Sequence, residues 1–226
     1  MKSIISSTLI LCATFLPTSC STIFHADFES GTSGQSPLSN PPGPPAGDSI
    51  SVGSEEFFFV SAEDAIAGDL SLSIRERPPA TETSGDHIIF RTSPISDETA
   101  PIYITWQGQI LDDGGMIVDS GVVGRYFGRV VFNNGQISMF DTPVGSYSIG
   151  DRHTVLISMF PDDMVYRLAV LGDASLEAPF AEANLRDLDG TPDNEGFVDV
   201  SVSASADQNR FYVMDDVTVS LRDPGD

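Results

Sequence analysis

Short stretches of alternating apolar and polar residues follow one another along the chain from residue 48 onward. They are rich in Val, Ile, Phe and Tyr, and clusters of Gly, Pro, Asp and Asn separate them, which is the pattern of β-strands joined by turns. No ten-residue window has a clear helical period; residues 177–188, "EAPFAEANLRDL", come nearest and are expected to be one short helix or irregular. The expected strands are residues 49–52, 56–60, 70–75, 87–92, 102–110, 128–132, 136–140, 153–160, 164–171, 197–203 and 211–221.

Two hairpins stand out within this series. "VVFNNGQISMF" turns at Asn133-Asn134-Gly135, residue types that tolerate the positive φ of a tight turn. "VLISMFPDDMVYRLAVL" turns at Pro161-Asp162-Asp163. Many short strands at even spacing predict an all-β sandwich or barrel, and 226 residues suit a single domain of that kind.

The first nineteen residues have a different composition. Met1-Lys2 precedes an apolar run over residues 4–16 that is too short to span a bilayer and is typical of a signal peptide. We therefore expect residues 1–19 to be a signal peptide cleaved before Cys20, and residues 20–226 to form one domain. In that domain "IFHADFE" alternates as a first strand should, and residues 31–48, rich in Pro, Gly and Ser, form a loop or linker.

Cys20 has no partner for a disulfide, because the only other cysteine, Cys12, lies inside the signal. "LPTSC" resembles the bacterial lipobox, whose cysteine is lipidated, although Pro17 stands where that pattern usually has an aliphatic residue. Two outcomes stay open: lipidation of Cys20, or ordinary cleavage that leaves a free thiol. We expect an exported protein, an outer-membrane or cell-envelope lipoprotein in the first case and a periplasmic or secreted protein in the second.

The charge of the chain restricts its partners. The formal net charge is −22, and removing the signal leaves ten arginines against 33 acids. Such a surface repels phosphate backbones and anionic headgroups, so we expect no nucleic-acid partner and membrane contact only through a lipid anchor. The acidity is consistent with cation binding without requiring it.

Three pieces of sequence, taken in order, carry a family resemblance. "ADFESGTSGQSP" opens the mature chain, "GRVVFNNGQISMFDTPVGSYSIGDRHTVLISMFPDDMVYRLAVLG" runs through its middle, and "RFYVMDDVTVSL" closes it. The middle piece resembles the concanavalin A-like, laminin-G-like jelly roll, and the outer pieces are similar to the first and last strands of carbohydrate-binding modules. The resemblance implies a jelly-roll β-sandwich of two antiparallel sheets with a long N-terminal Pro/Gly-rich loop.

The last strand suggests a metal site. Unbroken alternation would place Asp215 on the same face as Val213 and Val217, and a buried carboxylate is costly unless it is paired or bound to a cation. If the first and last strands pair, Asp27 and Glu29 lie near Asp215 and Asp216. Oxygen ligands of this kind suit calcium, and the resemblance implies a structural calcium site in about this place. The alternatives are a bulge at Asp215-Asp216 that turns both outward, or backbone hydrogen bonds to Asp215.

Candidate catalytic groups are few. The chain has three histidines, none in a nucleophile or zinc motif, and it lacks the E-x-D-x-x-E spacing of jelly-roll glycanases and the Arg, Gln-x-His and Tyr set of alginate lyases. For glycan binding, Tyr103 and Gln107 share one face of their strand. Trp106 is a third candidate, although it shares its face with two isoleucines, which favours core packing. We expect a non-catalytic protein that binds extracellular or cell-envelope glycans. The alternatives are an adhesion protein of the envelope with protein partners, and a divergent polysaccharide lyase or hydrolase.

Overall fold

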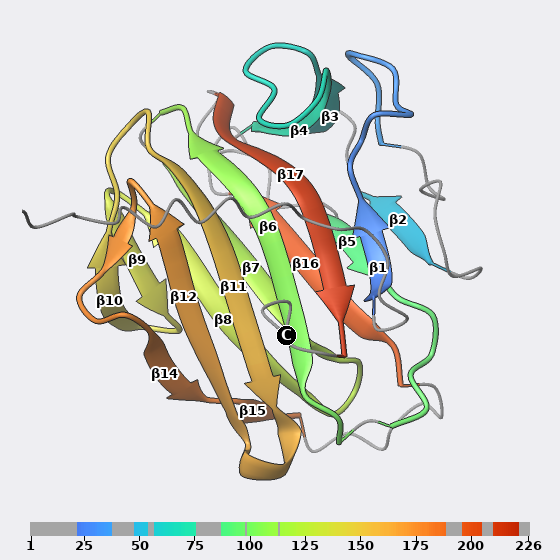
Figure 1. Ribbon diagram of the computed structural model, residues 1–226, viewed down its shortest axis with the longest axis vertical. Coiled ribbons are helices and arrows are strands. Elements are labelled where there is room, and N and C mark those ends of the chain that lie inside the picture. Colours follow the sequence, from blue (N-terminus) through green and yellow to red (C-terminus); the bar gives the residue numbers. More distant parts are fainter. Residues whose placement is uncertain are drawn as a thin grey trace, which may run out of the picture.

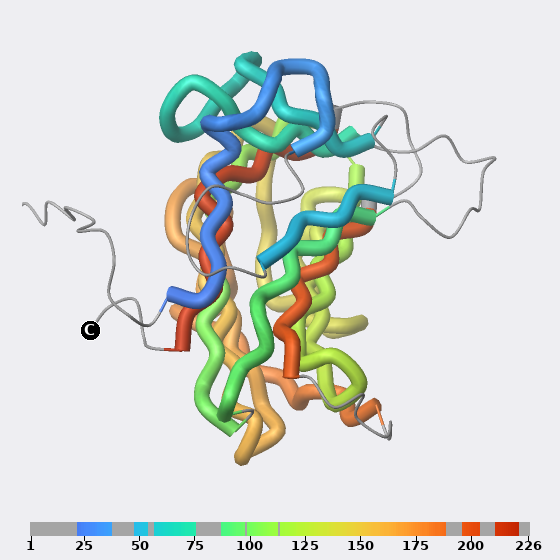
Figure 2. Tube along the Cα trace, turned by 90° about the vertical axis from the view of Figure 1, so that its right-hand side faces the viewer, coloured from blue at the N-terminus to red at the C-terminus, as the bar shows by residue number. Residues whose placement is uncertain are grey.

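The computed structural model describes residues 22–37, 48–53, 57–75, 87–97, 99–112, 114–188, 196–204 and 210–221. The signal peptide, Cys20 and most of the Pro/Gly-rich loop lie outside these ranges, so the expectations for them stay predictions. Within the described residues the chain forms two antiparallel sheets packed face to face, and the predicted jelly-roll sandwich is confirmed (Figures 1 and 2).

Sheet A has the last strand at its centre. β17 (Arg210–Ser220) pairs on one side with β6 (Ile102–Ile110) and on the other with both β4 (Ser71–Arg75) and β1 (Thr22–Ala26). β4 and β1 fit along the same edge of β17 because β4 pairs with its first half and β1 with its second half. The sheet continues through β11 (Arg152–Phe160), β12 (Val165–Gly172) and β14 (Ala181–Asn184), and ends at the opposite side with β3 (Phe58–Ser61).

Sheet B lies behind sheet A in the view of Figure 1 and is mostly a meander. Its strands, in spatial order, are β13 (Ser175–Leu176), β10 (Thr142–Ser146), β9 (Gln136–Met139), β8 (Tyr126–Asn133), β7 (Gly115–Val122), β16 (Val198–Ala204), β5 (His87–Arg91) and β2 (Ser49–Val52). A short strand, β15 (Arg186–Asp187), also pairs with β8.

Both predicted hairpins are present. Asn134 and Gly135 adopt φ values of 48° and 78°, as the turn between β8 and β9 requires. The second hairpin turns through a short 3-10 helix, η1 (Pro161–Asp163), followed by Met164 with a left-handed φ of 52°. The segment 177–188 contains the short edge strands β14 and β15 instead of a helix. Within the described ranges, no helix has the length and apolarity needed to span a bilayer.

The core lies between the inner faces of the two sheets. In β6 the alternation is regular: Ile102, Ile104 and Trp106 point into the core, while Tyr103 and Gln107 lie on the outer face. The predicted strand pattern for residues 102–110 is therefore confirmed. The short strands β13, β14 and β15 were not predicted. β7 and β10 were also missed, because glycine, proline and serine interrupt their apolar positions.

Candidate functional site

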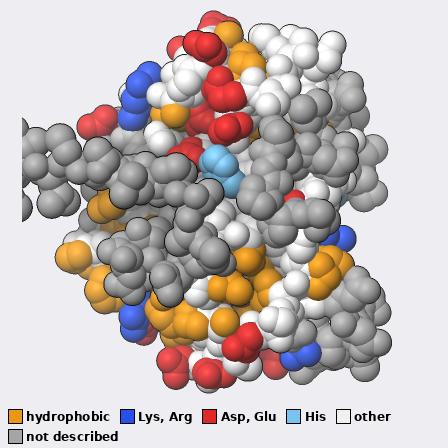
Figure 3. Space-filling view, turned by 45° about the vertical axis from the view of Figure 1, so that its right-hand side comes forward, with side chains coloured by type: hydrophobic (Ala, Val, Ile, Leu, Met, Phe, Trp, Pro, Cys, Tyr) orange, Lys and Arg blue, Asp and Glu red, His pale blue; other side chains and the backbone are white. Residues whose placement is uncertain are grey.

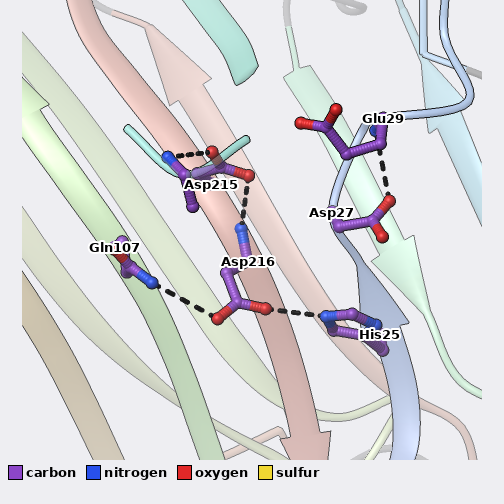
Figure 4. Close-up of polar contacts among 7 residues, drawn as sticks. His25, Asp27, Glu29, Gln107, Asp215 and Asp216 are labelled. Atoms are coloured by element: carbon purple, nitrogen blue, oxygen red, sulfur yellow. Dashed lines mark hydrogen bonds and ion pairs between the residues drawn. The ribbon is translucent and has the colours of Figure 1, made fainter. Parts of the chain in front are cut away.

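The acids predicted to form a metal site lie around the contact of the first and last strands. β1 runs antiparallel to β17, with His25 opposite Thr218, so the two ends of the domain are adjacent as expected. Asp215 and Asp216 lie in the middle of β17, and Asp27 and Glu29 follow the end of β1 (Figure 4). On the same side of the molecule, acidic side chains gather beside a histidine (Figure 3).

A β-bulge at Asp215–Asp216 changes which side chains face the core. The register between β17 and β6 shifts between Asp215 and Thr218, and Asp216 has a φ of 53°, a left-handed value. Tyr212 and Met214 face the core before the bulge, while Val217 and Val219 face it afterwards. The expectation of unbroken alternation is therefore wrong. The bulge that the sequence left as an alternative is present, but it does not turn both acids to solvent, because Asp215 is 1% exposed.

The buried carboxylate of Asp215 is satisfied by hydrogen bonds. Asp215 is 1% exposed; Ser71 Oγ donates to its Oδ2 at 2.6 Å and the backbone N–H of Ala67 donates to the same atom at 3.0 Å. The backbone N–H of Asp216 donates to Oδ1 at 2.8 Å. Burial raises the pKa of Asp215, while these hydrogen bonds act in the opposite direction. Ala67 lies in the loop between β3 and β4, and Ser71 is the first residue of β4. Asp215 thus anchors this loop.

His25, Asp216 and Gln107 form a second group on the outer face of sheet A. His25 Nε2 lies 2.7 Å from Asp216 Oδ1, and Gln107 Nε2 donates to Asp216 Oδ2 at 3.4 Å. The hydrogen bond to Asp216 raises the pKa of His25 against the opposing effect of burial. The same bond lowers the pKa of Asp216, so both groups favour the charged pair.

Asp27 and Glu29 also accept protein hydrogen bonds. Asp27 Oδ1 accepts from the backbone N–H of Glu29 at 3.1 Å. Glu29 Oε1 accepts from the backbone N–H groups of Asp69 and Leu70, each at 3.0 Å. Glu29 and Asp215 therefore hold two points of the same loop between β3 and β4.

Several of the carboxylate oxygens that calcium would use already accept hydrogen bonds from N–H and O–H groups of the protein. In the part of the chain that the structure describes, no group of three or more His, Cys, Asp or Glu side chains is arranged to hold a metal. The structure joins Asp215 and Asp216 to protein donors and does not gather all four acids around one point. Calcium binding stays a prediction of the sequence.

The three candidate glycan-binding residues on β6 have different surroundings. Trp106 is 1% exposed and its Nε1 donates to the Tyr212 hydroxyl at 3.0 Å, so it packs in the core, the alternative that the sequence favoured. Gln107 bonds Asp216, as described. Tyr103 lies on the outer face and makes an edge-to-face contact with Phe160, with ring centroids 6.4 Å apart.

The outer face of sheet B carries a different arrangement. Arg91 on β5 forms two hydrogen bonds with Asp199 on β16, at 2.7 and 2.6 Å, and Arg129 on β8 does the same with Asp119 on β7, at 2.6 and 2.7 Å. β5, β16, β7 and β8 are consecutive in the sheet, so the two ion pairs lie on neighbouring strand pairs, offset by two residues along the strands. We call these four residues the Arg–Asp surface.

Aromatic rings support both arginines of the Arg–Asp surface. The Arg91 guanidinium lies over the ring of Phe197 at 5.5 Å, and that of Arg129 lies over Phe127 at 5.8 Å. Side-chain exposure is 41% for Arg91 and 35% for Arg129, so the groups are held firmly while still reaching solvent. The hydrogen bond to its aspartate raises the pKa of each arginine, which stays charged.

Sequence reasoning missed the Arg–Asp surface because it did not recognise β7, the strand that carries Asp119. Arg91 and Arg129 did lie within expected strands, at positions facing outward. An arginine within an expected strand is a usable indicator of a functional surface, because only ten arginines follow the signal peptide. Its partner, however, depends on the cross-strand register.

Comparison with known proteins supports the fold. No protein-family model and no curated protein matches the sequence. An endo-β-1,4-glucuronan lyase from the fungus Trichoderma reesei is 11% identical with a TM-score of 0.52, over 88% of this chain and 95% of the lyase. A protein of unknown function from Shewanella oneidensis is 14% identical with a TM-score of 0.51, over 97% and 95% of the two chains.

The receptor-binding domain of botulinum neurotoxin type G is also similar in structure. It is 11% identical with a TM-score of 0.52, over 90% of this chain and 48% of the toxin domain, so this chain spans about half its length. At these identities the likeness establishes a shared β-sandwich fold and nothing finer.

Proposed function

We propose that this chain binds glycans through the Arg–Asp surface, without catalysing a reaction on them. The observation that carries the proposal is the pair of adjacent Arg–Asp ion pairs, each with its arginine over a phenylalanine, on four neighbouring strands of sheet B. The contrast with sheet A supports it. There the carboxylates of Glu29 and Asp215 are used to hold a loop, whereas the Arg–Asp surface holds no loop of the described residues.

The chemistry of sugars matches such a surface. A sugar hydroxyl both donates and accepts hydrogen bonds, and neighbouring hydroxyls need a donor and an acceptor held close together. Each guanidinium has five N–H groups, and Arg91 and Arg129 each use their Nε and Nη2 nitrogens on the aspartate, which leaves the Nη1 donors for a ligand. The half-buried ring of Phe127 adds an apolar face for the C–H groups of a sugar. The similarity in fold to a protein named as a glucuronan lyase is consistent with this proposal.

A glycan array followed by titration calorimetry tests the proposal on the mature chain. Arg129→Ala and Asp199→Ala should each weaken binding of the best array ligand by at least about tenfold, the loss of one or two hydrogen bonds to charged groups. Arg167→Ala is the matched control, because Arg167 also bonds an acid, Glu182, at 2.7 Å and lies over Phe160 at 5.0 Å, but on sheet A. Each variant should keep the wild-type melting temperature within a few degrees, since exposed ion pairs contribute about 0–1 kcal/mol.

Three results would overturn the proposal. Binding that survives both substitutions but is lost in Arg167→Ala would move the site to sheet A. Absence of binding to any glycan would favour the adhesion protein with protein partners. Release of unsaturated uronates from a polysaccharide, measured by their ultraviolet absorbance, would identify a lyase.

We also propose that the protein is exported and anchored by a lipid on Cys20. The apolar run at residues 4–16 and the lipobox-like "LPTSC" support this proposal. Expressed in a bacterium with labelled palmitate, the wild-type chain should incorporate the label and Cys20→Ala should not. Equal incorporation in both would exclude Cys20 as the lipidation site.

A further inference from the structure

We infer that the ligand of the Arg–Asp surface is a polysaccharide that carries carboxylate groups, and that Arg186 binds one of these groups beside Phe140. The inference rests on the proposed glycan-binding function and names the class of glycan. It concerns a patch of four residues at one side of that surface, Phe127, Arg129, Phe140 and Arg186, which we call the Arg–Phe patch.

The Arg–Phe patch is a continuous series of contacts. Arg129 lies over Phe127, and Phe127 meets Phe140 edge to face with ring centroids 5.7 Å apart. Arg186 lies over the other phenylalanine, 4.3 Å from the centroid of Phe140, the shortest of the cation–π contacts within the described residues. Strand pairing fixes this geometry, because Arg186 on β15 is directly opposite Phe127 on β8. The Arg–Phe patch therefore adjoins the Arg129–Asp119 pair without a gap.

Arg186 differs from its neighbours in its hydrogen bonds. Arg91 and Arg129 each bind an aspartate through two nitrogens. Arg186 is exposed, and within the described part of the chain no carboxylate forms an ion pair with it. Its guanidinium, oriented by Phe140, keeps its planar set of donors for a ligand. That set matches a carboxylate in a two-point contact, which is how arginine most specifically recognises an anion.

The net negative charge of the chain does not contradict the binding of a carboxylate by Arg186. The net charge is −22, but charges more than a Debye length apart, about 8 Å at physiological ionic strength, are largely screened. Near the Arg–Phe patch, Asp119 is neutralised by Arg129, and Asp141 acts on Arg129 as well. Among the described residues, Arg186 is the arginine of the Arg–Phe patch without an ion pair. A neutral sugar would leave it unused, whereas a uronate would pair with it.

Matched oligosaccharides test the inference, because they differ only in the carboxylate. The probes are tetrasaccharides of β-1,4-linked glucose and glucuronate, of β-1,4-linked mannose and mannuronate, and of α-1,4-linked galactose and galacturonate. Calorimetry on the mature wild-type chain should give a uronate dissociation constant at least about tenfold below that of the neutral partner in one or more pairs.

Two variants assign that preference to a residue. Arg186→Ala should bring the ratio of the two constants close to one. Arg75→Ala is the control, since Arg75 lies over Phe59 at 5.0 Å and also lacks an ion pair within the described ranges, but is on sheet A. It should keep the wild-type ratio. Circular dichroism and melting curves confirm that both variants fold.

The outcomes separate the inference from the proposed function. If neutral members bind as tightly as uronates, or if Arg186→Ala keeps the preference, the inference is wrong while glycan binding stands. If no member of any pair binds and the array is also negative, the proposed function fails, and the inference fails with it.

Discussion

His153 should make the protein less stable at mildly acidic pH, and its surroundings give the magnitude. His153 is 5% exposed and its ring stacks on Phe132, with centroids 5.7 Å apart and an interplanar angle of 16°. Its Nε2 lies 2.6 Å from the Tyr212 hydroxyl, which also accepts from Trp106 Nε1. This geometry lets the tyrosine donate its own proton to Nε2, an arrangement that requires a neutral His153. No group in the described part of the chain bonds Nδ1.

The sign and size of this change in stability follow from the linkage between protonation and folding. Burial lowers the pKa of His153 from 6.5 to about 4. Between these values the unfolded chain binds a proton that the folded chain does not, so stability is greatest above pH 6.5 and falls as the pH decreases toward 4. For this group alone, going from pH 7 to pH 5 should lower the free energy of unfolding by about 2 kcal/mol.

Urea unfolding at pH 7, 6 and 5 measures this for the wild type and for His153→Gln, whose amide oxygen can accept from Tyr212. All other groups titrate alike in the two proteins, so the difference between their pH slopes isolates His153. The variant should lose about 2 kcal/mol less than the wild type between pH 7 and pH 5. Equal slopes would refute the reasoning. If the variant does not fold, the NMR titration of His153 in the wild type decides: a midpoint near 6.5 would contradict the burial argument.

Three further predictions concern the acids near β17. Adding calcium to EDTA-treated protein should leave the melting temperature unchanged, because Glu29 and Asp215 already accept protein hydrogen bonds; a rise of several degrees would show that the sequence-based prediction of a calcium site is right. Asp215→Asn should lower the free energy of unfolding by about 1–3 kcal/mol in urea, because an amide NH₂ or a neutral oxygen replaces a buried acceptor of three hydrogen bonds; no loss would contradict the anchoring role. NMR should place the pKa of His25 above 6.5 and find it lower in Asp216→Asn, since the bond to Asp216 is the main cause of the rise; an unchanged value would argue against the pair in solution.

The fold was predictable from local pattern, because alternation and turn chemistry act over a few residues. Trp106 falls among isoleucines in the sequence and in the core, and Asn134-Gly135 turns as its residue types require. The bulge at Asp215–Asp216 was not predictable in the same way. One extra residue reverses the faces of everything before it, and the sequence of β17 is apolar enough on both faces to fit either register. The Arg–Asp surface depends on four strands from distant parts of the chain, so no local pattern contains it.

The position of β17 at the centre of sheet A makes the whole sheet depend on long-range strand pairing. β1, β4 and β6 all pair with residues 210–220. Without β17, β1 and β4 lack the strand that joins them to β6, and the front layer of the sandwich cannot close. These contacts join residues far apart in the sequence, which makes folding slow by the standards of small domains. A variant truncated after residue 209 should remain sensitive to protease, whereas the chain of 226 residues should be resistant.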